Sequence, residues 1–400
     1  MDQASHHSNE RQEDLQKLNR YILFLSQDPA NTNLLIDTIQ LAIDLGEVQA
    51  AEKLIEEHKE SFKDNAVGNA LAGHVMLAIG RADESVKFLT SALNQGNHDS
   101  SVYLNLAYAY FFLRTYDQAL AILSEHTELG DLFPPIYFVL YARVSHITDN
   151  PQQAIDLLEK LHAEHESTAE SAGLLSLILF EQNQQTEKAL QLANEALIKN
   201  PKAIEALIAR TSLYLDSGHY EQALVDIQQA TEYHPESGRA WSSLAQVEFN
   251  NLHFTEAKHA AGKAVLHMAD HIGTWHLLGW ANLMLGELAE ALDAFKKSYD
   301  LDRRFAATHS GLAAVYAHLD EIKKANQHIQ IADKLDSNGL ASTYAKIVLL
   351  NKNNDTEKAN HLFDVAKHKF NQQLGNTPQN LIQKRLYELQ KNQLDNKNIH

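Results

Sequence analysis

The sequence predicts an all-α protein, an α-solenoid built from helix–turn–helix repeats. The first observation is a strict period of 34 or 35 residues between ten small residues: Ala51, Ser85, Ala119, Ala154, Ala189, Ala223, Ala257, Ala291, Ala325 and Ala359. The second is that an apolar residue follows each of them four positions later, and another small residue follows three after that in most cases. These spacings fall on one face of an α-helix. Such a period indicates repeats that bury their apolar faces only by stacking.

Each repeat is taken to begin 19 residues before its small marker residue. The ten starts are Thr32, Ala66, Ser100, Pro135, Glu170, Ile204, Gly238, Ile272, Ala306 and Leu340. The sixth repeat shows two helical stripes, the first ending at Asp216 and the second beginning at Tyr220. Gly218 lies between them, and glycine favours the left-handed conformation that ends many helices. Pro235 ends the second stripe, so the repeat is a helix–turn–helix.

This repeat resembles the tetratricopeptide repeat, a pattern of Trp or Leu, Leu, Gly or Ala, Tyr, Gly, Tyr, Ala, Phe, Ala and a final Pro. Trp241 and Trp275 occupy its first aromatic place, and Pro201 and Pro235 its terminal proline place. The resemblance covers residues 32–373. It implies a right-handed superhelix in which the first helix of each repeat lines a concave groove, with places 2, 5, 9, 12 and 13 pointing into it. Asn69, Gly173 and Thr343 depart from the pattern at the first aromatic place.

Residues outside the repeats are expected to cover their ends. Residues 1–10 are polar and are expected to form a disordered tail. Residues 11–31 hold an N-terminal capping helix with leucines on its apolar side, and residues 374–400 hold a C-terminal capping helix and a tail. Terminal repeats need such covers because each would otherwise expose an apolar face.

Composition narrows the functional class. The formal net charge of −18 argues against nucleic-acid binding, which needs a surface rich in Lys and Arg. The same charge gives a mild bias toward basic partners. The chain has no cysteine, no apolar run long enough to span a membrane and no leader sequence, so we expect a cytoplasmic protein.

Two clusters of side chains stand out at the implied groove places. The first, from the third and fourth repeats, consists of Tyr108, Phe111, Phe112, Arg143 and His146. The second, from the seventh and eighth repeats, consists of Arg239, Gln246, Phe249, His276 and Trp280. Aromatic and Arg side chains are the usual anchors of protein interfaces, so we expect both clusters to contact a partner. The alternative is that the aromatic side chains pack against neighbouring helices. On the first interpretation, removing Arg239 or Trp280 weakens binding and spares the fold.

Other kinds of site find little support. A subgroup of the family grips the carboxylate end of chaperones with Lys at place 5 and Asn at place 9, and neither residue stands at its place in any repeat here. The 22 histidines lack the close spacing of zinc ligands, so we expect no metal and no cofactor. The sequence contains no phosphate-binding loop, nucleophile elbow or His-Glu-x-x-His motif.

The sequence therefore predicts a non-catalytic scaffold or adaptor that holds a segment of a partner protein in a preformed concave groove. Two alternatives remain: a receptor for a small peptide signal, and an enzyme whose site is built on the superhelix. The partner, the pathway and the oligomeric state stay open.

Overall fold

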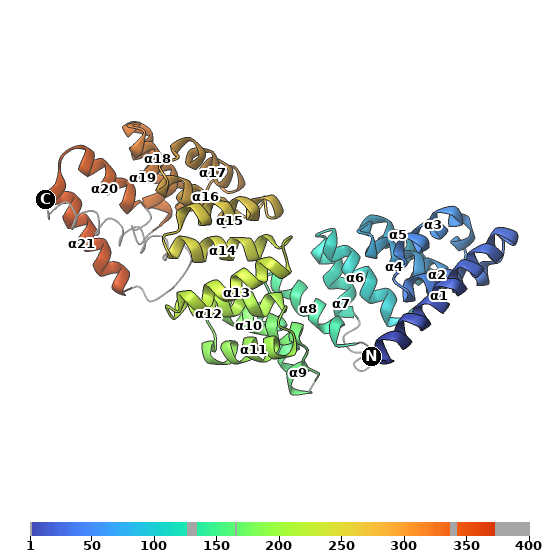
Figure 1. Ribbon diagram of the computed structural model, residues 1–400. Coiled ribbons are helices and arrows are strands. Elements are labelled where there is room, and N and C mark those ends of the chain that lie inside the picture. The colour runs from blue at the N-terminus through green and yellow to red at the C-terminus, as the bar shows by residue number, and fades with distance from the viewer. Residues whose placement is uncertain (1, 126–133, 165, 337–341, 373–400) are drawn as a thin grey trace. The chain divides into compact units, whose positions relative to one another are not determined.

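The computed structural model describes residues 2–125, 134–164, 166–336 and 342–372 (Figure 1). Within these ranges the chain forms 21 α-helices, one short 3-10 helix at Lys59–Phe62, and no β-strand. The N-terminal helix α1 (Asp2–Gln27) precedes ten helix pairs. The predicted all-α helical repeat fold is thus confirmed.

The first helices of the pairs begin at or close to the starts taken from the sequence. They are α2 (Thr32–Asp44), α4 (Ala66–Ala78), α6 (Ser100–Phe112), α8 (Pro135–Ile147), α10 (Ala169–Glu181), α12 (Ile204–Asp216), α14 (Gly238–Asn250), α16 (Ile272–Met284), α18 (Ala306–His318) and α20 (Thr343–Lys352). The second helices are α3 (Val48–Glu57), α5 (Ala82–Asn94), α7 (Tyr116–Glu125), α9 (Pro151–Ala163), α11 (Thr186–Lys199), α13 (Tyr220–Tyr233), α15 (Phe254–His267), α17 (Leu288–Leu301), α19 (Ile322–Leu335) and α21 (Thr356–Gln372).

The periodic small residues lie on the second helices and are buried there. None of the ten exposes more than 2% of its surface, so each second helix lies close against its neighbours. Phe295 of α17 shows why small residues are needed opposite large ones. A Cβ added at Gly279 of α16 or at Gly311 of α18 would clash with the Phe295 ring, which therefore packs against the backbone of both helices.

Ser85 is the one marker residue that is not alanine, and it keeps its place through a hydrogen bond. Its hydroxyl is fully buried and donates to the carbonyl oxygen of Gly73 on the paired helix α4, at 2.7 Å. A buried hydroxyl without a partner destabilises a protein, so this bond explains why serine is accepted here.

The turn inside each repeat uses one backbone conformation. The residue two positions after each first helix has a positive φ in all ten repeats of the described chain: Gly46, Gly80, Arg114, Asp149, Asn183, Gly218, Leu252, Gly286, Asp320 and Asn354. The next amide donates back to the last turn of the helix, as His219 does to the carbonyl oxygen of Tyr214 at 2.8 Å. This is a left-handed helix cap, which glycine adopts without strain.

Leu252 is the least suited residue at this turn position. Its φ is 65°, a conformation that costs a residue with a Cβ roughly 1–2 kcal/mol. We therefore expect Leu252→Gly to raise the free energy of unfolding by about 1 kcal/mol, less than the full strain because glycine also loosens the unfolded chain. Urea unfolding followed by circular dichroism measures it. The converse change, Gly218→Ala, should lower stability by a similar amount, since φ is 78° there; a stabilising Gly218→Ala would contradict the explanation.

The helices divide into two compact segments, residues 1–178 and 179–400, with the division inside α10. In the N-terminal segment, Leu18 and Leu25 of α1 join Leu35 and Ile39 of α2 in a buried cluster, so α1 covers the apolar face of the first repeat. In the C-terminal segment, α12, α14, α16 and α18 each contact the next first helix along the chain, and buried apolar residues of α14, α16, α18 and α20 belong to one continuous core.

The ends of the chain differ in part from the expectation. The helix α1 begins at Asp2, where the sequence suggested a disordered tail over residues 1–10. Residues 2–10 contain neither proline nor glycine, so nothing in them ends a helix that continues from residue 11. The expected C-terminal capping helix and tail, residues 374–400, lie outside the described residues.

Candidate functional site

The C-terminal end of α6 carries an exposed aromatic side chain. Phe112 is 60% exposed, although large apolar residues are usually covered. Its ring centroid lies 6.2 Å from that of Tyr108 and 5.8 Å from that of Phe111, and Phe111 in turn contacts Tyr116 of α7 at 5.9 Å. Tyr108 and Phe111 are half-buried. Of the three aromatic side chains in the first predicted cluster, Phe112 is thus exposed and Phe111 packs partly against α7; their contact with a partner stays a prediction.

Charged side chains of two other helices, α8 and α10, lie near Tyr108. Burial raises the pKa of Tyr108, the nearby Arg143 guanidinium of α8 lowers it, and the Glu170 carboxylate of α10 raises it further. The net direction is upward, so the phenol stays neutral and can donate a hydrogen bond at neutral pH. Arg143 therefore lies close to the aromatic end of α6, as the sequence predicted.

Helix α8 contacts α6 and is fixed by residues on its buried side. The hydroxyl of buried Tyr137 donates to the carbonyl oxygen of Leu123 on α7 at 3.1 Å, and Gln153 of α9 donates to the hydroxyl of Tyr141 at 2.6 Å. The opposite side of α8 holds half-buried Arg143 and His146.

Four large apolar side chains remain exposed on α4, α6 and α8, at places 2 and 13 of their repeats. They are Val67 (51%), Phe112 (60%), Ile136 (40%) and Ile147 (44%). We call the surface formed by these four residues with His74, Tyr108, Arg143 and His146 the α4–α6–α8 face. Adjacent helices are joined across it where Asn105 of α6 donates to Nδ1 of His74 on α4 at 3.3 Å.

The second predicted cluster is part of the core, and the expectation that it lies open is wrong for four of its five residues. Phe249 is fully buried, and Trp280, His276 and Gln246 expose 2%, 4% and 9%. The Trp280 ring makes T-shaped contacts with Phe295 of α17 and with Tyr344 of α20, with ring centroids 5.7 Å and 5.6 Å apart.

The covering residues come from neighbouring helices. Phe249 contacts Phe254 of α15 with ring centroids 5.2 Å apart, and Gln246 donates to Asn250 one turn later at 3.0 Å. His276 contacts the rings of Phe295 and Phe305. The groove places of the eighth repeat are thus filled by the protein's own side chains, which leaves no room there for a partner.

Arg239, the fifth residue of that cluster, is exposed but engaged. Its guanidinium forms an ion pair with Glu181, 58 residues earlier, so that α14 is joined to α10 across the intervening repeat. Glu181 and Arg239 both stand at groove places by the sequence analysis. The two side chains therefore neutralise each other, and Arg239 alone offers no charge that a partner must match.

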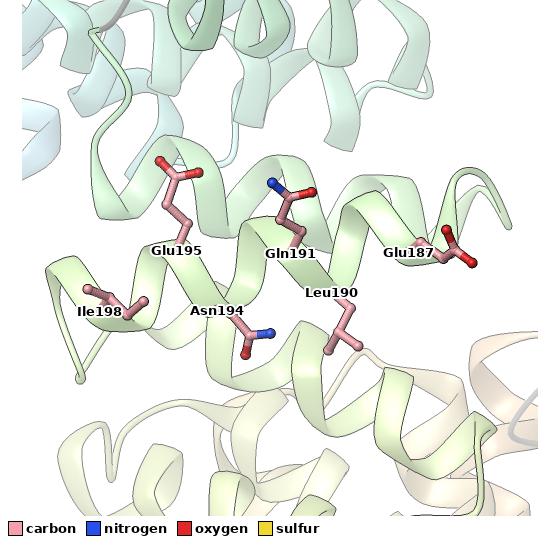
Figure 2. Close-up of a pocket in the computed structure, with 6 residues that line it drawn as sticks. All are labelled: Glu187, Leu190, Gln191, Asn194, Glu195 and Ile198. Atoms are coloured by element: carbon pink, nitrogen blue, oxygen red, sulfur yellow. The ribbon is translucent and has the colours of Figure 1, made fainter.

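A shallow depression lies along α11 and was not anticipated from the sequence. Its lining residues all come from that one helix, as Figure 2 shows: Glu187, Leu190, Gln191, Asn194, Glu195 and Ile198. Two of its polar side chains are already paired, Glu195 with Lys199 and Asn194 with Arg210, each at 2.8 Å. A surface contributed by a single helix lacks the enclosing walls of a small-molecule site.

No group of three or more His, Cys, Asp or Glu side chains in the described chain is placed to hold a metal ion. None of the helices described in the structure is long and apolar enough to cross a membrane.

Four residues of this face lie outside the clusters predicted from the sequence: Val67, His74, Ile136 and Ile147. Val67 and Ile136 stand at place 2 of their repeats, directly after the first residue of a helix. An apolar residue in the first turn of a repeat helix was the available signal, whereas the two predicted clusters consist of aromatic, histidine, arginine and glutamine side chains.

A family model described as ChAPs, Chs5p-Arf1p-binding proteins, matches residues 139–293. Anaphase-promoting complex subunit 3 of Schizosaccharomyces pombe is 23% identical over 168 residues, which is 42% of this chain and 25% of that protein. The chain thus spans about a quarter of that relative's length.

Solved structures with a similar fold include three kinds of protein. The Cut9–Hcn1 hetero-tetramer of the anaphase-promoting complex matches with a TM-score of 0.47 and 14% identity, over 92% of this chain and 84% of that chain. YrrB, described as a TPR protein with an unusual peptide-binding site, matches with a TM-score of 0.39 and 21% identity, over 47% and 97%. MamA matches with a TM-score of 0.35 and 18% identity, over 38% and 88%. The ten helix pairs with their 34-residue period confirm the resemblance to tetratricopeptide repeat proteins.

Proposed function

We propose that this protein is a non-catalytic scaffold that binds a segment of another protein on the α4–α6–α8 face. The observation that carries the proposal is Phe112, a large aromatic side chain with 60% of its surface in solvent and two aromatic neighbours that restrict its position. An ordered, exposed aromatic residue is a typical anchor of a protein interface. Preformed helices limit the entropy lost on binding, so a few such anchors suffice.

The family comparison supports the same class of function. The ChAPs family is described as binding Arf1p, and the yeast relative is a subunit of a multiprotein complex. Both names describe association with other proteins. We infer the same for this chain and include neither catalysis, a cofactor nor nucleic-acid binding in the proposal. A cytoplasmic location belongs to it as well.

Replacing the exposed anchor tests the proposal. Phe112→Asp should weaken the partner complex by about 2 kcal/mol or more, because a charge replaces an apolar anchor at the interface. The fold should survive, since the ring is mostly solvated. The partner is first isolated by affinity capture from the native organism and then titrated by calorimetry against the wild type and the variant.

The matched control is Ile198→Asp on α11, where the side chain is 84% exposed. It introduces the same charge at a more exposed apolar position of a second helix and should leave binding unchanged. If Ile198→Asp disrupts the complex while Phe112→Asp binds normally, the partner lies on the second helices and the α4–α6–α8 face is not the site.

A further inference from the structure

The tenth repeat is packed differently from the repeats that precede it. Its first helix, α20, has 10 residues, whereas the nine earlier first helices have 13 residues each. In the C-terminal segment, α12, α14, α16 and α18 each contact the preceding second helix more extensively than the preceding first helix. The order is reversed for α20, which contacts α18 more extensively than α19. Helix α20 therefore lies mainly against a first helix of the array.

Helix α18 is covered on every side within the described structure. All residues from Ala307 to Ala317 are buried, although a helix with one side open to solvent leaves a stripe of exposed residues. The buried residues at its groove places 2, 5, 9 and 12 are small: Ala307, Ser310, Ala314 and Ala317. Tyr344 and Val348 of α20 pack against the core that contains Ala314. It follows that α20 covers the groove places of α18, where small side chains let a second helix approach closely.

Two side chains of α20 reach the apolar part of this surface. The Tyr344 ring makes a T-shaped contact with Trp280 of α16, two repeats earlier, with ring centroids 5.6 Å apart. The Tyr344 hydroxyl lies 3.1 Å from Nε2 of His318, the last residue of α18, and shares a hydrogen bond with it. Val348 follows one turn later and packs against the same core as Trp280. With α20 in place, no room remains for another molecule over Trp280.

Two lysines attach α20 to carboxylates of the neighbouring repeat. The Lys352 ammonium pairs with Asp320 at 2.6 Å and donates to the main-chain carbonyl oxygen of His318 at 3.0 Å, at the C-terminal end of α18, where a cation is favoured. The Lys346 ammonium pairs with Asp333 of α19 at 2.8 Å. The two lysine side chains are 36% and 30% exposed, and a partly solvated pair contributes only up to about 1 kcal/mol. These contacts therefore orient α20 without holding it firmly.

We propose that the groove side of α16 and α18 binds an amphipathic helix of a partner protein, and that α20 covers this surface until the partner helix displaces it. The partner helix carries an aromatic residue, an apolar residue and a lysine at successive fourth positions, as α20 does at Tyr344, Val348 and Lys352. Positions i, i+4 and i+8 lie on one face of a helix and span about 12 Å. An amphipathic helix in an apolar groove is a recurring mode of peptide recognition. This surface belongs to the C-terminal segment and is independent of the α4–α6–α8 face.

Displacement of α20 does not require the earlier repeats to unfold. The stability of a repeat protein is transmitted mainly between neighbouring repeats, so α20 can leave α18 while the helices from α12 to α17 stay folded. Its limited contact with α19 makes this separation easier. Once α20 has left, the Trp280 ring becomes an aromatic anchor beside the small side chains of α18, and such anchors contribute most of the binding energy of an interface.

The choice of a lysine follows from local contacts and not from the net charge of this region. Helix α19 itself carries three lysines, at positions 323, 324 and 334, and Lys324 pairs with Glu321. At the end of α18, however, Asp320 exposes 74% of its side chain and the last carbonyl groups of the helix accept hydrogen bonds. A lysine brought there finds both an anion and acceptors, whereas a glutamate at the same place would be repelled by Asp320.

Introduced thiols measure whether α20 detaches on its own, because the chain has no cysteine. Ser310→Cys places a thiol at a groove place of α18, and Ser298→Cys places one on α17; the two positions are 3% and 0% exposed. Both thiols should react slowly with a thiol reagent in the full-length protein. Adding Tyr344→Ala, which removes the ring that covers Trp280, should speed the reaction at position 310 about tenfold or more and leave position 298 slow. Tyr344→Phe keeps the ring and should leave both thiols slow.

A labelled peptide of residues 342–353 stands in for the partner helix. In fluorescence anisotropy it should bind the full-length Tyr344→Ala variant about tenfold more tightly than the wild type, whose own α20 covers the surface. The same peptide with Lys352→Glu should bind about tenfold more weakly, because it brings a carboxylate next to Asp320. Phe112→Asp, in the N-terminal segment, should change neither affinity.

The outcomes distinguish a binding surface from a simple packing contact. A variant whose thiol at position 310 becomes reactive but which binds no peptide would overturn the binding surface. Equal affinities of the wild type and Tyr344→Ala would place the peptide elsewhere and overturn it too. If both thiols become reactive together in Tyr344→Ala, the milder change Lys352→Glu decides. Reaction at position 310 alone then supports a separable cover, and reaction at both positions or at neither overturns it.

Discussion

Trp280→Ala is expected to lower the stability of the C-terminal repeats by about 3–5 kcal/mol, the usual range for removing a large buried aromatic side chain. Trp280 exposes only 2% of its surface and makes T-shaped contacts with Phe295 and Tyr344. Its indole Nε1 donates to Nε2 of His276 at 2.9 Å. The change therefore leaves a cavity bounded by α16, α17 and α20 and removes the donor whose hydrogen bond His276 Nε2 accepts.

The loss should be local, because a repeat protein transmits stability mainly between neighbouring repeats. Amide hydrogen exchange should show α16, α18 and α20 opening more readily in the variant while α2 and α4 keep their protection. Trp275→Ala is the control on the same helix. Trp275 is half-buried and its indole donates to the carbonyl oxygen of Ala269, so its removal should cost clearly less. Equal losses in both variants would contradict the burial argument.

The repeats could be predicted from the sequence because their signal is periodic. Every marker residue obeys the same local rule, a small side chain on a second helix facing its partner, and ten copies of a weak local signal add up to a strong one. The turn position illustrates the limit of local rules. Gly46 and Gly218 predict a left-handed helix cap from the sequence. Leu252 and Arg114 do not, yet they adopt the same conformation because the flanking helices impose it.

The site could be predicted only in part, since openness depends on residues far along the chain. Trp280, at place 9 of its repeat, and Phe112, at place 13, are both aromatic residues at the implied groove places, so the sequence does not distinguish them. Trp280 is covered because Tyr344, two repeats later, lies over it, whereas Phe112 is left 60% exposed. Arg239 is engaged because Glu181 stands 58 residues earlier. Neither contact follows from periodicity, which fixes where a side chain points but not what meets it.

Lowering the pH should destabilise the C-terminal repeats through His276, a buried imidazole held neutral. Because Trp280 donates to Nε2, the proton of the neutral ring is assigned to Nδ1, and a protonated ring could no longer accept that bond. Burial lowers the pKa of His276 to about 3. Burial, with a smaller contribution from His309, also lowers the pKa of His328 to about 4. The Nδ1 atoms of His309 and His328 lie 2.9 Å apart and share a hydrogen bond.

The direction in which stability changes with pH follows from how many protons the folded and the unfolded states bind. Below a pH of about 6.5 the unfolded chain binds a proton at each of these histidines and the folded chain does not, so stability falls as the pH falls toward the folded pKa. Between pH 7 and 5 His276 should account for about 2 kcal/mol. Asp216 acts in the opposite direction, because burial raises its pKa to about 6 and the folded state gains stability as that carboxyl is protonated.

His276→Gln separates these contributions, because the glutamine amide oxygen can still accept from Trp280 and does not titrate. Urea unfolding of both proteins at several pH values should show the wild type losing about 2 kcal/mol more than the variant between pH 7 and 5. Asp216 is present in both proteins and cancels in the comparison. Parallel stability curves would mean that His276 takes up its proton at the same pH in the folded and unfolded states, which would contradict a neutral ring held by a hydrogen bond to its Nε2. A wild type that gains stability relative to the variant on acidification would reverse the sign and exclude a buried neutral histidine at this position.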